Sequence, residues 1–258
     1  MPRTARKKSL TGIYHVIWRG NNQQIIFECE KDYQYFIDLV QYYKEECHFK
    51  VYSYCLMDNH IHMLVKEDDV SLHIFMGKIA TKFAKWYNLK YKRCGYLFQD
   101  RFKSEPVNDI SYFLTVFRYI MRNPVKAGVV QNIADYRWSS FGAFRNEDDS
   151  FVDINDVVEC FADYKACMKY LIEKQEVSEE RCMEYYSKKR IPDEVALRMI
   201  EESTGCHSPS DFLHLDLATR NQYVKKMLRM GIPVRQLSRL TGVSRYIIQK
   251  IFRGLGLV

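Results

Sequence analysis

The sequence lacks several features that would define its class directly. Its eight cysteines include no C-x-x-C pair, so zinc-finger spacing is absent and reduced thiols are expected. No stretch approaches the roughly 18 consecutive apolar residues that a membrane span needs. The basic start Met1–Lys8 is not followed by the apolar run of a signal peptide. We therefore expect a cytoplasmic globular protein with no membrane partner.

Acidic residues are missing altogether after Asp216, and the charge of the chain is uneven. Residues 1–144 carry 21 Lys/Arg and 14 Asp/Glu (+7), residues 145–216 carry 9 and 18 (−9), and residues 217–258 carry 9 and none (+9), which gives 39 − 32 = +7. Two basic modules on either side of an acidic segment indicate nucleic acid contacted in two places. Solvated helix faces are the alternative interpretation of the same pattern.

Hydrophobic spacing predicts an α+β domain at residues 1–144 with the ferredoxin-like order β-α-β-β-α-β and one extra helix. The expected strands are 14–20, 49–56, 60–65 and 101–107, and the expected helices are 32–46, 71–92 and 109–122. Asp32 is the expected N-cap of the first helix, and Asn123-Pro124 is expected to end the last one. Residues 145–216 are predicted to be an acidic helical linker region with helices at 155–175 and 192–203, and residues 217–258 an all-α DNA-binding domain.

Two histidines, His60 and His62, occupy alternate positions of the third expected strand. Side chains at i and i+2 project from the same face of a strand, so the two imidazoles can share a divalent metal. The pattern alone is weak, since most H-x-H pairs are unrelated surface or core residues. A metal site needs a third ligand and a chemical task.

Tyr119 and Asn123 lie four residues apart on the last expected helix and therefore share one helix face. A phenol beside a metal-polarised phosphate can attack phosphorus, and the Asn123 amide oxygen suits Mg²⁺ or Mn²⁺. With 19 tyrosines in the chain, spacing does not single out Tyr119, and an aromatic packed on the sheet explains it equally.

Five ordered sequence blocks carry a family resemblance over about residues 9–144. They are Gly12-Ile-Tyr-His-Val-Ile-Trp-Arg-Gly-Asn21, Tyr54-Cys-Leu-Met-Asp-Asn-His-Ile-His-Met-Leu-Val65, Gly95-Tyr-Leu-Phe-Gln-Asp-Arg-Phe-Lys-Ser104, Tyr119-Ile-Met-Arg-Asn-Pro-Val-Lys-Ala-Gly128 and Tyr136-Arg-Trp-Ser-Ser140. Together they resemble the REP-associated tyrosine transposases, a branch of the single-tyrosine HUH transposases.

The resemblance implies a DNA strand transferase that cuts and rejoins single strands at hairpins, with endonuclease and ligase activities. It implies that His60, His62 and Asn123 hold a divalent metal and that Tyr119 forms a 5′-phosphotyrosine. Asp58 departs from the proline that these proteins commonly carry there, and we expect it to shape the turn. A homodimer is open, because the tyrosine helix of related enzymes serves its own subunit or a partner's.

Basic residues beside the expected sheet edges are candidate contacts to single-stranded or hairpin DNA: Arg19, Arg101 and Lys103. Trp18 and Phe98 are candidates for base stacking, although core packing is the simpler interpretation of each.

The stretch 234–251 has the spacing of a helix-turn-helix, in which Gly242 supplies the turn and Ser244 can cap the second helix. The exposed side of that helix would present four side chains to the major groove of a duplex, namely Arg245, Tyr246, Gln249 and Lys250. A small helical bundle with a basic face is the alternative.

Two other functions remain open from the sequence. The chain could be a DNA-binding regulator that keeps the transposase fold without catalysis. A nicking enzyme of plasmid replication shares the histidine pair but lacks support from the five blocks.

Overall fold

The computed structural model describes residues 6–148, 150–173, 182 and 191–254. The chain divides into two compact units, residues 1–185 and 186–258, each with its own core. No helix among the described residues is both long and apolar enough to cross a membrane.

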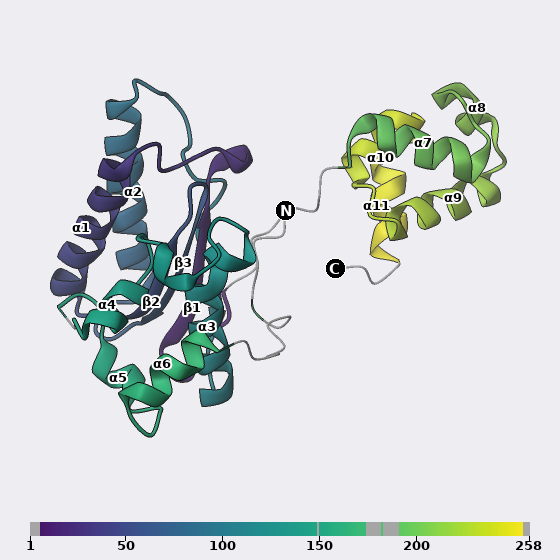
Figure 1. Cartoon of the computed structure of the whole chain (residues 1–258). Coiled ribbons are helices and arrows are strands. Elements are labelled where there is room, and N and C mark those ends of the chain that lie inside the picture. The colour runs from purple at the N-terminus through teal and green to yellow at the C-terminus, as the bar shows by residue number, and fades with distance from the viewer. Residues whose placement is uncertain (1–5, 149, 174–181, 183–190, 255–258) are drawn as a thin grey trace. The chain divides into compact units, whose positions relative to one another are not determined.

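The first unit is built on a four-stranded antiparallel sheet with the spatial order β2-β3-β1-β4 (Figure 1). Its elements are β1 (Ile13–Arg19), α1 (Glu30–Cys47), β2 (Lys50–Leu56), β3 (His60–Lys66), α2 (Leu72–Lys90), β4 (Lys103–Pro106) and α3 (Ile110–Lys126). This order of elements and strands is the ferredoxin-like arrangement with one added helix, so the predicted fold class is confirmed.

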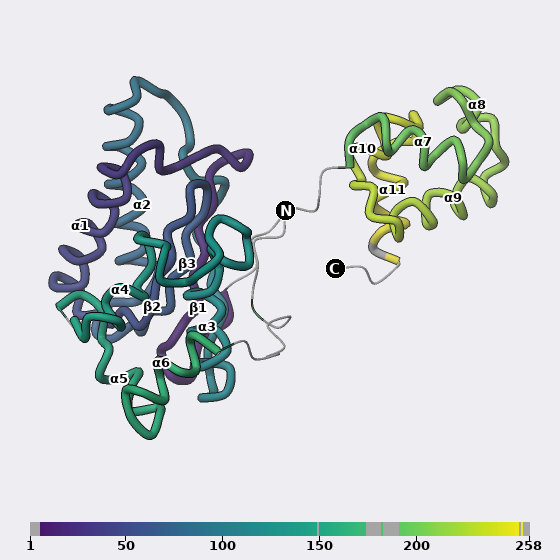
Figure 2. The backbone as a smooth tube through the Cα atoms, in the orientation of Figure 1, coloured from purple at the N-terminus to yellow at the C-terminus, as the bar shows by residue number. Residues whose placement is uncertain are grey.

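The sheet has an apolar core on each face because its strands alternate side chains between the two. On one face Val16, Trp18 and Met63 pack under α1 and α2, which run side by side in Figure 2. On the other face Leu64 and Cys55 pack against α3. The two faces therefore bring the histidine strand and the tyrosine helix into one layer.

Helix α1 begins earlier than predicted, at Glu30 with Cys29 as N-cap, because Asp32 acts from inside the first turn. Its carboxylate accepts hydrogen bonds from the backbone N–H groups of Glu28 (2.7 Å) and Cys29 (3.1 Å). The buried Asp32 also pairs with Lys90 of α2 at 2.5 Å, so the residue joins the two helices.

The fifth sequence block covers the outer edge of β2, which would otherwise expose unpaired backbone groups. The N–H of Leu56 donates to the carbonyl of Trp138, and the N–H of Ser140 donates to that of Tyr54. The Tyr136 hydroxyl donates to the carbonyl of Leu56 at 2.6 Å. This block is therefore part of the sheet's structure.

The acidic region contributes helices to both units, which differs from the predicted boundaries at 144 and 216. In the first unit, α4 (Phe141–Asn146), α5 (Ile154–Val158) and α6 (Tyr164–Ile172) stand in place of a single helix over 155–175. Buried residues such as Val157 and Leu171 join the α3-side core. The second unit contains α7 (Asp193–Thr204), α8 (Pro209–His214), α9 (Leu217–Arg229), α10 (Val234–Thr241) and α11 (Arg245–Arg253). Apolar contact, not charge, decides where each helix belongs.

Candidate active site

The sheet sets the positions of both histidines of the H-x-H pair. In the β1–β3 pairing, Arg19 lies opposite His60 and Ile17 lies opposite His62. Ile61 points to the other face and is fully buried in the core beneath α1 and α2. His60 and His62 therefore share the face covered by α3, with ring centroids 5.1 Å apart.

Helix α3 carries Tyr119 and Asn123 to the same face, and it does not end at Asn123 as predicted. Pro124 is accommodated inside the helix, which continues to Lys126. The missing proline N–H costs one hydrogen bond, while the following N–H of Ala127 still reaches the carbonyl of Asn123 at 2.9 Å. The extra turn places Lys126 on the face of Tyr119 and Asn123.

These residues meet around one open pocket of about 350 Å³. Its lining consists of Arg19, Asn59, His60, His62, Tyr119, Asn123, Lys126 and Ala127. The structure thus brings together the four residues predicted for chemistry and one of the predicted DNA contacts. Asn59 and Lys126 were not among the predicted site residues.

The polar atoms of His60 and Asn123 fit a shared cation. His60 Nδ1 lies 2.7 Å from Asn59 Oδ1, an acceptor, so the ring proton belongs on Nδ1. His60 Nε2 then presents a lone pair, and it lies 3.4 Å from Asn123 Oδ1, a second acceptor. Two acceptors that face each other favour a cation between them.

The described residues contain no group of three His, Cys, Asp or Glu side chains that could hold a metal. A site here would therefore consist of two imidazoles and the Asn123 amide. Such a set of nitrogen and oxygen donors suits a divalent cation of the Mg²⁺ or Mn²⁺ kind.

A third histidine, His15, lies behind His62 and was missed in the sequence. His15 and His62 are 0% and 2% exposed, and His15 Nε2 lies 3.0 Å from His62 Nδ1. Burial lowers the pKa of His15 to about 3. Burial, and then the nearby His15, His60 and Lys126, lower the pKa of His62 well below its ordinary value. Both imidazoles therefore stay neutral, the state in which a histidine ligates metal.

The strand period offered a signal for His15. It stands two residues before Ile17 on β1, which places it on the same face and diagonally across from His62. Because the cross-strand register is a tertiary property, the sequence did not connect the two histidines.

Tyr119 is 2% exposed and is surrounded by the histidines and a cation. Its ring centroid lies 5.5 Å from that of His62 and 5.9 Å from that of His15, edge-on in both cases. The Lys126 ammonium lies 4.9 Å from the Tyr119 ring centroid. The packing fixes the ring, and the lysine adds positive charge beside it.

The three predicted DNA contacts of the first unit occupy different places. Arg19 lines the pocket with Tyr119. Lys103 is exposed on β4 opposite Ile17, in the same row across the sheet as His62. Arg101 lines a separate basic pocket of about 530 Å³ that also includes Arg6, Lys7 and Lys8.

The aromatic candidates for base stacking differ in their exposure. Trp18 is 1% exposed and packs edge-on against Phe36, so it belongs to the core. Phe98 is half-buried and stacks on Trp18 with a centroid distance of 5.7 Å. Core packing therefore explains both residues.

The backbone of Asp58 shapes the turn before His60. Its carbonyl accepts hydrogen bonds from the N–H groups of Ile26 (2.8 Å) and Phe27 (3.2 Å). These bonds join the turn to the segment that follows β1, in line with the expected structural role.

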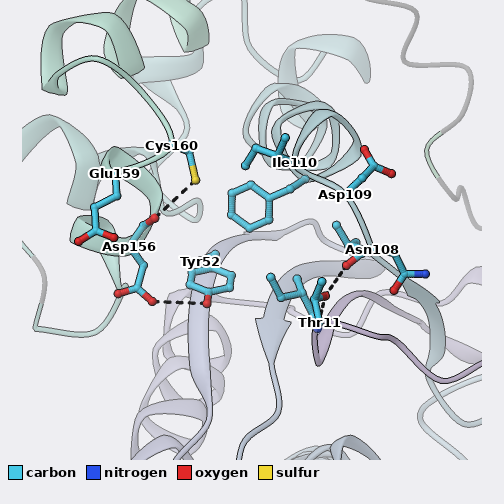
Figure 3. Close-up of a pocket in the computed structure, with 11 residues that line it drawn as sticks. Thr11, Tyr52, Asn108, Asp109, Ile110, Asp156, Glu159 and Cys160 are labelled. Carbon is cyan, nitrogen blue, oxygen red and sulfur yellow. Dashed lines mark hydrogen bonds between the residues drawn. The ribbon is translucent and has the colours of Figure 1, made fainter.

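A further pocket of about 280 Å³ lies at the N-terminal end of α3 and includes none of the predicted site residues (Figure 3). Its polar groups bind one another: the Tyr52 hydroxyl donates to Asp156 Oδ2 at 3.4 Å, and Asp156 also pairs with Lys50 at 2.5 Å. Asp109 on its rim caps α3 by accepting from the N–H of Tyr112. These contacts account for the pocket's polar residues structurally.

In the second unit, α10 and α11 join through Gly242, whose φ of 72° is the left-handed conformation expected of the turn. Ile248 is fully buried, whereas Arg245, Tyr246 and Lys250 are exposed and Gln249 is half-buried. Ser244 is the N-cap residue, but its side chain makes no capping hydrogen bond. The Ser238 hydroxyl instead ties the two helices by donating to the carbonyl of Val243 at 2.8 Å.

Comparison with known proteins adds independent findings. Residues 8–123 match the family model described as "Transposase IS200 like". A Haemophilus influenzae protein named as a REP-associated tyrosine transposase is 29% identical over 114 residues, which cover 38% of this chain and 64% of that relative. A solved REP-associated tyrosine transposase bound to a REP hairpin aligns over 60% of this chain and 90% of its own, with a TM-score of 0.46 and 18% identity.

The matched part of the chain, residues 8–123, has the sequence pattern of the IS200-like transposases. Within that class, the chain is similar to the REP-associated tyrosine transposases, and this confirms the resemblance carried by its sequence blocks. The match spans less than two thirds of the Haemophilus influenzae relative.

Proposed function

We propose that the first unit is a metal-dependent DNA transposase that cleaves and rejoins single-stranded DNA at hairpin-associated sites. The observation that carries this proposal is the meeting of His60, His62, Tyr119 and Asn123 around one open pocket. A tyrosine, two neutral imidazoles, an amide and a lysine are the groups that phosphoryl transfer to a phenol needs.

In the proposed reaction, the Tyr119 hydroxyl attacks the scissile phosphorus. The phenol loses its proton, a phosphotyrosine bond forms to the 5′ side, and the broken P–O bond leaves with the 3′ oxygen, which takes up a proton. Rejoining reverses these steps, because a 3′-hydroxyl attacks the phosphotyrosine and releases the phenol. The energy of the broken phosphodiester stays in the covalent link, so no ATP is required.

The other residues of the pocket have separate tasks in this proposal. His60, His62 and Asn123 would hold Mg²⁺ or Mn²⁺, which neutralises charge that builds on the phosphate. Lys126, whose ammonium is 4.9 Å from the Tyr119 ring centroid, places a second positive charge beside the nucleophile. Arg19 on the pocket wall is suited to hold a neighbouring phosphate.

The second unit is proposed to bind duplex DNA through α11. Support comes from the Gly242 turn, the buried Ile248, and a surface with exposed Arg245, Tyr246 and Lys250. Gln249 lies on the same short helix, and its amide could contact a base edge. A cytoplasmic location and a homodimer also stay proposals.

Tyr119→Phe tests the proposed reaction. The change removes one hydroxyl from a ring that is held by packing, so the fold and DNA binding should persist while the covalent adduct disappears. The adduct is read as a DNA-shifted band on a denaturing gel, with EDTA abolishing it in the unmodified protein. An adduct of normal yield in Tyr119→Phe would exclude Tyr119 as the nucleophile. DNA binding without any adduct in the unmodified protein would favour the non-catalytic regulator.

A further inference from the structure

Two loops beside the candidate active site present polar and aromatic side chains to solvent. One is the turn 20–24 after β1, and the other is the segment 93–99 before β4. We propose that Asn21, Asn22, Gln23 and Tyr96 on these loops form a platform that binds and distinguishes unpaired DNA bases next to the scissile phosphate. This inference rests on the proposed function of the first unit and names where its single strand would lie.

The platform is continuous with the pocket. Arg19, which lines the pocket, directly precedes Gly20, and the N–H of Gly20 donates to the carbonyl of Asn59 at 2.8 Å. Asn59 is also the residue whose side chain contacts His60 Nδ1. A strand whose phosphate reached Tyr119 would therefore have its adjoining nucleotides beside the turn 20–24.

Backbone hydrogen bonds fix the two loops to each other. The N–H of Asn21 donates to the carbonyl of Leu97 at 2.8 Å, and the Gln24 side-chain amide donates to the same carbonyl at 2.6 Å. The carbonyl of Gln24's side chain in turn accepts from Arg93. Since these bonds hold the backbone, the exposed side chains are presented from a rigid base, as a specific binding surface requires.

The turn also adopts an unusual backbone. Asn22 and Gln23 have φ values of 52° and 65°, which non-glycine residues seldom adopt. Gly20 cannot carry a side chain, because a Cβ there would lie 2.1 Å from the carbonyl oxygen of Gln24. Backbone strain of this kind is often retained where it positions functional groups. Here it turns three successive amide side chains outward, and all three are exposed.

The chemistry of these side chains matches unpaired bases. Asn and Gln amides offer a donor and an acceptor together, which complement base edges. Tyr96 is 86% exposed, and an exposed ring in a basic surrounding can stack on a base that is free of its partner. Arg93 on the same loop and Lys126 in the pocket supply positive charge for the backbone of the strand.

The experiment measures binding of the full chain to a DNA hairpin that carries a randomised single-stranded 5′ extension. Fluorescence anisotropy is recorded in EDTA, so that no strand is cut during the titration. Tyr96→Ala should weaken binding by about 5- to 100-fold, as expected for the loss of one stacked base, and Tyr96→Phe should bind within about twofold of the unmodified protein. Tyr42→Ala, at a tyrosine of α1 that is 60% exposed, is the matched control and should change nothing.

Base preference is measured by sequencing the extensions that remain bound. Asn22→Gly retains the left-handed backbone and removes the amide, so it should relax the preference at one or two positions while overall affinity changes little. If Tyr96→Ala binds like Tyr42→Ala and Asn22→Gly keeps the original preference, the platform is excluded even though the unmodified protein forms its DNA adduct. If the unmodified protein forms no adduct and binds no hairpin, the proposed function itself fails, and the platform with it.

Discussion

His15 and His62 contact each other in the core of the first unit, with His15 Nε2 3.0 Å from His62 Nδ1 and both rings almost fully buried. Because His62 Nδ1 is engaged in this contact, His62 Nε2 is the nitrogen left to serve as a ligand. A hydrogen bond behind a ligating histidine fixes its ring and its tautomer.

We expect His15→Leu to weaken divalent-metal binding by about 10- to 100-fold, because His62 would lose the partner that orients it. His15→Gln, whose amide can still form the hydrogen bond, should restore most of the affinity. Calorimetric titration of the protein with Mn²⁺ gives this result without any DNA. Equal affinities for the unmodified protein and His15→Leu would show that the contact has no positioning role.

Acid should destabilise the first unit through the same residue. The pKa of His15 is about 3 in the fold and 6.5 ordinarily, so the unfolded chain takes up a proton that the native ring does not accept. The free energy of unfolding is therefore unaffected above about pH 7 and falls as the pH drops toward 3, by about 2 kcal/mol between pH 7 and 5.

Urea unfolding at a series of pH values measures this effect. The three tryptophans, Trp18, Trp86 and Trp138, all belong to the first unit, so their fluorescence reports its unfolding. His15→Gln should show a shallower loss of stability between pH 7 and 5. Parallel curves for the two proteins would contradict the assignment of this proton uptake to His15.

The N-terminus of α3 depends on Asp109, whose carboxylate accepts from the N–H of Tyr112 at 2.8 Å. Asp109→Ala should lower the free energy of unfolding by about 1 kcal/mol, and Asp109→Asn should preserve most of it. Ser71→Ala is a suitable control, since Ser71 is the N-cap residue of α2 but its side chain makes no capping bond. A loss as large in Ser71→Ala would mean that the capping bond is not the cause.

Duplex binding by α11 should depend on Arg245. Arg245→Ala should weaken binding to a double-stranded fragment several-fold and reduce the salt dependence of binding by about one counterion if the residue contacts a phosphate. Lys225→Ala removes the same charge from an exposed position of α9 and should have a smaller effect. Adduct formation by Tyr119 should persist in both variants. Identical duplex affinities in the two variants would leave only a general electrostatic role for this unit.

The sequence predicted the sheet well because strand patterns are local. Alternation placed His60 and His62 on one face of β3, and the structure has them there. The ends of helices were predicted less well. Asp32 was expected to begin α1 but closes its first turn from the third position, and α3 continues through Pro124. Both outcomes depend on packing, since buried contacts outweigh the local preferences of a cap residue or a proline.

The sequence by itself determined the order of the elements, the face of the histidine pair and the family resemblance, because these follow from short-range periodicity and from motifs read along the chain. Tertiary structure decided that His15 supports His62, that Lys126 reaches Tyr119, and that Arg101 lines a different pocket from Arg19. Each of these relationships joins residues through strand register or through the path of a helix over the sheet. Such relationships arise only when separate segments pack together and thereby fix which side chains meet.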